Sequence, residues 1–236
     1  MVEAAIILAG GLGTRLRSVV SDVPKPMAPI GGRPFLAHQL DYWIAQGIKR
    51  FVLSVGYKHE LVMDYFGRSY HGACIDYAVE STPLGTGGGV LSAVNILGNS
   101  ASFLLLNGDT YFEVDIKRLV NFAEANDVDW CFSLFNTNDV GRYLGMDVSP
   151  QGRIISLQSE NIAQHSHLAN GGVYWVNQRT LSNWTVLLGS KVSLEDDIFP
   201  SELASGRRLF GLEFQGTFID IGLPEDYYRS MEMLVI

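Results

Sequence analysis

The sequence predicts an α/β fold in which a Rossmann-like, mixed and mostly parallel sheet forms the middle of three layers. The first observation is a set of short, continuous apolar runs, typical of strands buried on both faces, at residues 4–9, 51–55 and 102–107. The second is that helical patterns separate these runs, at residues 35–46, 59–66 and 90–96. Strands that alternate with helices imply crossover connections, with helices on both faces of the sheet. The third is that 236 residues without a linker or repeat indicate a single domain over 1–236, with no C-terminal β-helix.

The other elements complete this pattern. A strand at 75–80 precedes the third helix. The second half predicts shorter strands with a more antiparallel arrangement, at residues 130–136, 145–149, 172–176 and 208–214, with a hairpin turn at 150–153. Two further helices are expected at residues 194–204 and 226–234. The shorter strands indicate an added layer that lines a substrate pocket.

The composition limits the class of partner. Lys and Arg number 17 against 25 Asp and Glu, and the net charge of −8 argues against a general binder of nucleic acid or membrane surfaces. Cys74 and Cys131 are isolated, no signal-peptide pattern is present, and no apolar run is long enough for a membrane span. These features predict a cytoplasmic protein with reduced thiols.

A glycine-rich loop follows the first strand at once, because residues 10–15 read Gly-Gly-Leu-Gly-Thr-Arg. Glycines at the carboxyl end of a buried strand leave backbone N–H groups free to approach an anion. Arg15 and Lys25 add a guanidinium and an ammonium, which together suit a polyphosphate. A tight strand-to-helix connection is the alternative explanation for the glycines alone.

Two other phosphate-binding patterns do not match this loop. It lacks the third glycine of Gly-x-Gly-x-x-Gly and the Gly-Lys-Ser/Thr of the ATPase loop. An NAD-dependent oxidoreductase also needs an acidic residue after the second strand, where residues 56–58 read Gly-Tyr-Lys. The loop therefore predicts a different kind of nucleotide site.

A family resemblance follows from this loop and a second motif. Residues 8–16 read Leu-Ala-Gly-Gly-Leu-Gly-Thr-Arg-Leu and residues 24–27 read Pro-Lys-Pro-Met, which together resemble the signature of the sugar-1-phosphate nucleotidyltransferases. Residues 16–30 most resemble the branch of D-glycero-D-manno-heptose-1-phosphate guanylyltransferases. The resemblance runs nearly end to end and implies the nucleotide-diphospho-sugar transferase type of fold. It also implies transfer of GMP from GTP to a sugar 1-phosphate, giving a GDP-sugar and pyrophosphate, in a possible homo-oligomer.

The resemblance implies a nucleotide site formed by Leu8, Ala9, Gly10, Gly11, Gly13, Thr14, Arg15, Lys25, Glu80, Gly85, Thr86 and Asp109. Arg15, Lys25 and Asp109 are the expected catalytic residues. Asp109 follows a buried strand at the same sheet edge as the loop, where a carboxylate suits Mg²⁺. Taken alone, Asp109 is equally consistent with a turn cap, and Asp220 with a helix cap; the resemblance assigns both to Mg²⁺.

Glu80 carries the argument for the base. A carboxylate only accepts hydrogen bonds, and guanine presents two adjacent donors on its N1–H and exocyclic amine. Relatives that use thymidine or uridine nucleotides tend to have Gln at this position, and an amide matches their mixed donor and acceptor edge. Glu80 therefore predicts guanine, with an exposed strand-end glutamate as the alternative.

The sugar side carries fewer signals. The resemblance implies contacts from Arg142, Gly145, Glu160, Asn170, Gly171 and Asp220. The family's lysine that holds the sugar phosphate is missing, because no lysine lies between Lys117 and Lys191. Arg142, His165 or His167 are the candidates to replace it. Two other functions stay open: a hexose-1-phosphate uridylyl- or thymidylyltransferase, and a non-catalytic nucleotide-sugar binding protein.

Overall fold

The computed structural model describes residues 2–11, 13–139, 142–158, 167–184 and 189–235. Four parallel strands form the centre of its main sheet, in the order β6 (Ala73–Val79), β4 (Arg50–Val55), β1 (Ala4–Ala9) and β7 (Ser102–Asn107). In register, Ile6 of β1 lies between Val52 of β4 and Leu105 of β7. The carboxyl ends of β1 and β7 therefore meet at one edge of the sheet, as required for a ligand site there.

Beyond β7 the sheet continues with mainly antiparallel strands. The long strand β12 (Leu168–Asn177) pairs with β7, with β9 (Trp130–Asn136) and with β10 (Gly145–Val148). β11 (Ile154–Gln158) extends this part next to β10, and β13 (Leu209–Glu213) runs parallel to β9. At the opposite edge, β5 (Ser69–Tyr70) pairs antiparallel with β6. The predicted antiparallel strands are therefore present, but they extend the main sheet rather than form an added layer, and β12 with 10 residues is longer than predicted.

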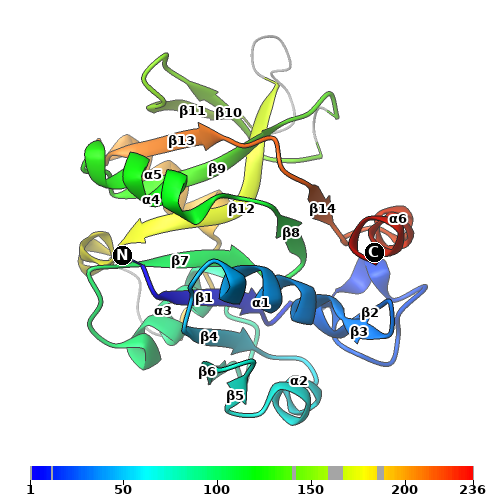
Figure 1. The fold of residues 1–236 in the computed structure, drawn as a ribbon. Coiled ribbons are helices and arrows are strands. Elements are labelled where there is room, and N and C mark those ends of the chain that lie inside the picture. The colour runs from blue at the N-terminus through cyan, green and yellow to red at the C-terminus, as the bar shows by residue number, and fades with distance from the viewer. Residues whose placement is uncertain (1, 12, 140–141, 159–166, 185–188, 236) are drawn as a thin grey trace.

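Helices cover both faces of the sheet (Figure 1). Successive residues of the central strands point to opposite sides, so each face has an apolar surface that a layer of helices buries. One core holds Ile7 and packs under α1 (Phe35–Ala45), α2 (His59–Phe66) and α4 (Ile116–Ala125). The other core holds Ile6 and packs under α3 (Gly85–Leu97) and α5 (Phe199–Ala204). The three-layer α/β architecture agrees with the sequence prediction.

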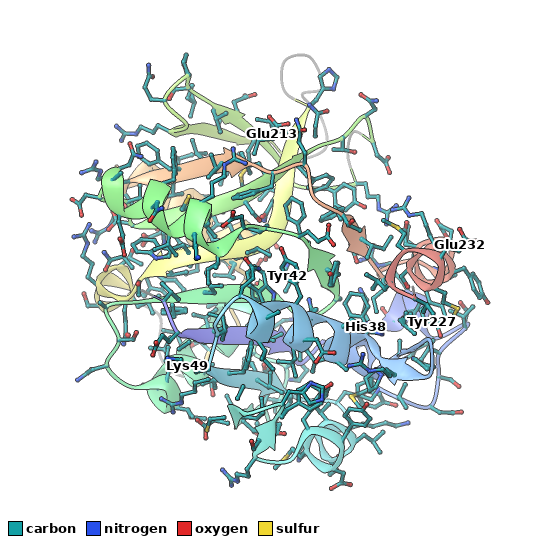
Figure 2. The ribbon with its side chains drawn as sticks, in the orientation of Figure 1. His38, Tyr42, Lys49, Glu213, Tyr227 and Glu232 are labelled. Carbon is teal, nitrogen blue, oxygen red and sulfur yellow. The ribbon has the colours of Figure 1, made fainter. Side chains whose placement is uncertain are left out.

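A third, smaller cluster joins the two ends of the chain. It contains Leu16 and Ile30 from the N-terminal part, and Ile219, Ile221 and Tyr227 from the C-terminal part. Here β14 (Phe218–Asp220) pairs with β8 (Thr110–Phe112), and α6 (Pro224–Leu234) lies beside the hairpin of β2 (Pro29–Ile30) and β3 (Arg33–Pro34), as Figure 1 shows. The Tyr227 hydroxyl donates to the Pro29 carbonyl at 2.9 Å, and Figure 2 shows Tyr227 on the side of α6 near this hairpin.

Three elements differ from their predicted bounds. α3 begins at Gly85 rather than at residue 90, because the glycine run forms the first turn of the helix. The predicted helix 194–204 consists of a π-helical turn, Leu194–Ile198, followed by α5. The strand predicted at 172–176 extends over the whole of β12. Strands of two or three residues, such as β8 and β14, were not predicted because their periodicity is too short to detect.

None of the described helices combines the length and the apolar character that crossing a lipid bilayer requires.

Candidate active site

A cavity of about 550 Å³ opens at the carboxyl ends of β1 and β7. It is lined by Leu8, Gly10, Gly11, Gly13, Thr14, Glu80, Pro83, Gly85, Thr86, Asn107, Asp109, Lys191 and Glu195. Most of the predicted nucleotide-binding residues are in this set. Ala9 is not, because its side chain is buried in the core. Arg15 and Lys25 are also not among the residues that line the cavity.

The glycine-rich loop is shaped to fit against Lys25. Gly13 has a left-handed backbone, with φ of 56°, and a Cβ atom there would lie 2.9 Å from the Cβ of Lys25. After Gly13 the chain forms a short 3-10 helix, Thr14–Leu16, in which Leu16 is buried and Arg15 is exposed. Glycine at 13 is therefore required both by the turn and by the close approach of the two motifs.

Lys25 brings two carboxylates together that are far apart in the sequence. Its Nζ lies 2.7 Å from Oδ2 of Asp109 and 3.6 Å from Oδ1 of Asp220. The backbones of the two aspartates are also tied, because the N–H of Ile221 donates to the carbonyl of Asp109 at 3.0 Å. The Lys25 side chain is only 10% exposed, whereas the side chains of Asp109 and Asp220 are 39% and 24% exposed and stay accessible to a ligand.

Lys25 is the ion-pair partner of both carboxylates in this cluster, and Arg142 adds a weaker attraction to Asp220. Burial raises the pKa of Asp220, and the negative charge of Asp109 raises it further, while Lys25 and Arg142 oppose both effects. Two carboxylates that share one ammonium suit an additional cation with oxygen ligands. Across the described part of the chain, no three His, Cys, Asp or Glu side chains form a group that would hold a metal by themselves. An ion held here by Asp109 and Asp220 would therefore need further ligands from bound phosphates or water.

Glu80 sits at the opposite end of the cavity in a fixed orientation. Its Oε1 accepts from the Ser54 hydroxyl at 2.7 Å, and its Oε2 accepts from the N–H of Leu84 at 3.0 Å. A Cβ atom on Gly10 would lie 2.8 Å from Oε1, and one on Gly89 would lie 3.1 Å from it. Each carboxylate oxygen keeps capacity to accept a further hydrogen bond from a ligand.

The structure adds a wall to the cavity that the sequence did not reveal. Residues 190–195, which we call the α3 strap, lie across the N-terminus of α3. The N–H of Val192 donates to the carbonyl of Leu84 at 2.8 Å, and the carbonyl of Val192 accepts from the N–H of Gly87 at 2.9 Å. Thr86 fixes the end of the strap, because its hydroxyl donates to Glu195 Oε2 at 2.8 Å and accepts from the N–H of Leu194 at 2.7 Å.

The α3 strap explains why Gly85 and Gly88 have no side chain, which contact with a ligand alone would not explain. A Cβ atom on Gly85 would lie 2.4 Å from the carbonyl oxygen of Val192, and one on Gly88 would lie 2.6 Å from that of Ser190. Because these glycines have no side chain, the strap packs close to α3 and places Lys191 and Glu195 in the cavity wall. The glycine run was the only sequence signal for this contact, and it does not say which distant segment packs there.

The predicted sugar-binding residues that the structure describes, Arg142, Gly145, Asn170, Gly171 and Asp220, are not among those that line this cavity. Asn170 uses both ends of its amide within the fold: Nδ2 donates to the Tyr174 hydroxyl at 2.7 Å, and Oδ1 accepts from the N–H of Gly172 at 3.1 Å. A Cβ atom on Gly171 would lie 2.5 Å from the ring of Phe112, so this glycine serves packing.

The remaining sugar-side predictions have mixed outcomes. Gly145 is the first residue of β10 and pairs with Gln158 and Ala169. Arg142 forms an ion pair with Asp226 of α6. Glu160 and His165 lie outside the described residues.

Comparison with known proteins identifies the family of this chain. The nucleotidyl transferase family matches residues 4–235. The chain is 40% identical over 227 residues to the D-glycero-alpha-D-manno-heptose 1-phosphate guanylyltransferase of Campylobacter jejuni, covering 96% of this chain and 98% of that protein. It is 38% identical over 230 residues to the protein of the same name from Aneurinibacillus thermoaerophilus, covering 98% and 97%.

A solved structure supports the fold at similar coverage. HddC from Yersinia pseudotuberculosis superposes with a TM-score of 0.84 at 34% identity, over 98% of this chain and 99% of that chain. The same protein complexed with GMP-PN superposes with a TM-score of 0.83 at 33% identity, with the same coverage. These matches confirm the predicted fold class. The chain therefore belongs to the nucleotidyl transferase family.

Proposed function

We propose that the protein transfers GMP from GTP to D-glycero-α-D-manno-heptose 1-phosphate, producing GDP-heptose and pyrophosphate. The observation that carries this proposal is the convergence of Lys25, Asp109 and Asp220 beside a glycine-lined cavity whose far end holds Glu80. The two guanylyltransferases that share 40% and 38% of their residues with this chain support the choice of GTP and of the heptose.

The reaction is an in-line displacement at phosphorus. An oxygen of the sugar 1-phosphate attacks the α-phosphorus of GTP, and the bond from that phosphorus to the β-phosphate oxygen breaks. No covalent protein intermediate is needed, so catalysis consists of positioning two anions and stabilising the charge that develops. Lys25 is held where it can do both, next to Asp109. Arg15 is exposed and follows Thr14, which lines the cavity, so Arg15 would contact the departing pyrophosphate.

The nucleotide would lie along the cavity from Glu80 to Asp109. The backbone N–H groups of Gly10, Gly11, Gly13 and Thr14 would face the phosphates, and Gly85 and Thr86 the base or ribose. The fixed carboxylate of Glu80 would accept from the two adjacent donors of guanine.

Asp109 and Asp220 would hold Mg²⁺ between the two substrates. Their oxygen atoms are the ligands this ion prefers, and its charge would offset the burial of two carboxylates at one place. When bound, Mg²⁺ supplies charge stabilisation at the phosphoryl oxygens. Gly145, Glu160, Asn170 and Gly171 remain our proposed sugar side, with Asn170 and Gly171 acting through the shape of β12.

We also place the reaction in the cytoplasm, supplying an activated sugar for a bacterial surface polysaccharide. The two cysteines, Cys74 and Cys131, are free thiols, which agrees with a reducing compartment.

A substrate panel tests the proposed function. Pyrophosphate release would be measured with Mg²⁺ for GTP, UTP, dTTP, CTP and ATP against heptose, mannose and glucose 1-phosphates. We expect GTP with the manno-heptose 1-phosphate to give the highest kcat/KM. A preference for UTP or dTTP would instead identify a hexose-1-phosphate enzyme. Binding of GTP or GDP-sugar without turnover of any pair would identify a non-catalytic binding protein.

A further inference from the structure

We propose that Arg142 is the cation that binds the phosphate group of the sugar 1-phosphate, and that Asp226 of α6 positions it. This inference rests on the proposed function and assigns the role left open by the absence of any lysine between Lys117 and Lys191. Two other lysines at the site have different positions: Lys25 is already engaged by both Asp109 and Asp220, and Lys191 lies on the wall of the nucleotide cavity.

The first observation is a buried carboxylate that pairs with arginine. The Asp226 side chain is only 3% exposed, in the first turn of α6, and Nη2 of Arg142 donates to its Oδ2. Nη2 of Arg229 lies 3.2 Å from its other oxygen. A buried carboxylate requires such partners, so the pairing with Asp226 holds the Arg142 guanidinium in place.

The second observation is that aromatic packing fixes the chain next to Arg142. The guanidinium lies 5.0 Å from the ring centroid of Tyr143, whose own ring contacts Phe135 and Phe218 at centroid distances of 5.1 and 5.5 Å. Phe218 is the first residue of β14, the strand that ends at Asp220. Arg142 is therefore attached to the element that carries a proposed Mg²⁺ ligand.

The third observation is that the Arg142 guanidinium keeps hydrogen-bond donors that no protein group in the described part of the chain uses. The positive charge of Arg142 also opposes the rise in the pKa of Asp220 that burial causes. Its side chain stays 22% exposed, and a guanidinium has five N–H donors, so the bond to Asp226 leaves others free. The remaining partner, Asp139, is 3.8 Å away and 61% exposed, where water weakens the attraction.

These facts fit a phosphate monoester on the sugar side. A guanidinium presents paired donors that match two phosphate oxygens at once, and an arginine seated on a carboxylate is held in one orientation before the ligand arrives. The competing explanation is that the Arg142–Asp226 pair only ties residues 142–148 to α6. That explanation predicts effects on stability rather than on one substrate.

Steady-state kinetics separate the two explanations. With GTP saturating and the heptose 1-phosphate varied, we expect Arg142→Ala to raise the KM for the sugar phosphate by about tenfold or more, with the KM for GTP unchanged. Arg142→Lys should recover part of this loss, because it restores a positive charge. Asp226→Asn should raise the same KM by a smaller factor, and Asp226→Asn in the Arg142→Ala background should raise it no further.

The control is Arg68→Ala, which removes an exposed arginine just after α2 that has no role in the proposal; its KM values should match those of the wild type. Equal effects of Arg142→Ala on both substrates, no recovery with lysine, or losses that follow the melting temperature would overturn the proposal. Calorimetric binding of the heptose 1-phosphate to wild type and Arg142→Ala gives a second readout. It still reports on Arg142 if the wild-type enzyme proves inactive, which would count against the proposed function instead.

Discussion

Glu80 illustrates how single residues in this site depend on one another. Its carboxylate fills the space next to Gly10 and Gly89, and Ser54 and Leu84 hold one oxygen each. The side chain therefore meets a ligand in one orientation, with both oxygens able to accept. This local arrangement is the reason we propose that Glu80 sets the choice of base.

Glu80→Gln should change the nucleotide preference. An amide has one acceptor and two donors, so it can no longer match the two donors of guanine and suits uracil or thymine better. We expect kcat/KM for GTP to fall by about 100-fold and the ratio of UTP to GTP activity to rise. Competition between the two nucleotides measures that ratio directly. An unchanged ratio in a folded variant would show that Glu80 does not read the base.

Ionised Asp220 should lower the stability of the folded protein when no metal ion is bound. Because its pKa is raised in the folded protein, mainly by burial, the ionised form is less favourable there than in the unfolded chain. That destabilisation is complete above the folded-state pKa and disappears below about pH 4, where the unfolded chain also binds the proton.

Asp220→Asn should therefore raise the melting temperature at pH 7 in EDTA, by roughly a few degrees, while it abolishes turnover. The gain should shrink as the pH falls toward 4. Thermal melts of wild type and variant across this range measure it. A variant that is less stable than wild type at pH 7 would contradict the charge account of the cluster.

At the scale of elements, the contact between the α3 strap and α3 is the feature that builds the cavity wall. Gly85, Gly87 and Gly88 lie in the first turn of the helix, and the strap occupies the space that their side chains would need. Helix propensity and packing therefore make opposite demands on these positions, and packing decides the sequence.

Gly88→Ala tests this directly. Propensity alone predicts that alanine stabilises the helix by about 1 kcal/mol. A Cβ atom at this position would lie 2.6 Å from the Ser190 carbonyl oxygen, so we expect a net loss of stability and of GTP binding instead. Asn95→Ala, at an exposed position of the same helix, is the control that should show only a small gain. Chemical denaturation of both variants decides between the two, and a stabilised Gly88→Ala would mean that the strap does not constrain α3.

The same elements show how far sequence reasoning reaches. The central strands and α2 could be predicted because their patterns are local and long enough to detect, and Asp109 and Asp220 because each lies in a recognisable motif. The α3 strap could not, because the hydrogen bonds that hold it at the cavity, from both backbone and side chains, join it to residues more than 100 positions away. Likewise, nothing local to Arg142 or Asp226 indicates their ion pair, which spans 84 residues.

At the scale of the whole molecule, the site forms where the two ends of the chain meet. In the sequence, Leu16 and Ile30 flank Lys25, and Ile219 and Ile221 flank Asp220. These four apolar residues pack in one cluster. This small core, and the Tyr227 hydroxyl bond to Pro29, hold the Pro-Lys-Pro-Met motif against β14. The chain must therefore be folded from end to end before the two carboxylates can act together.

The most direct test of the account is whether Asp109 and Asp220 hold one divalent ion. Mn²⁺ can replace Mg²⁺ as a spectroscopic probe, and its affinity in the presence of GTP can be measured by electron paramagnetic resonance. We predict that Asp109→Asn and Asp220→Asn each weaken Mn²⁺ binding by about tenfold or more, and that the double variant is little weaker than either single one. Wild-type affinity in either single variant would contradict a shared ion, and with it the proposed reaction centre.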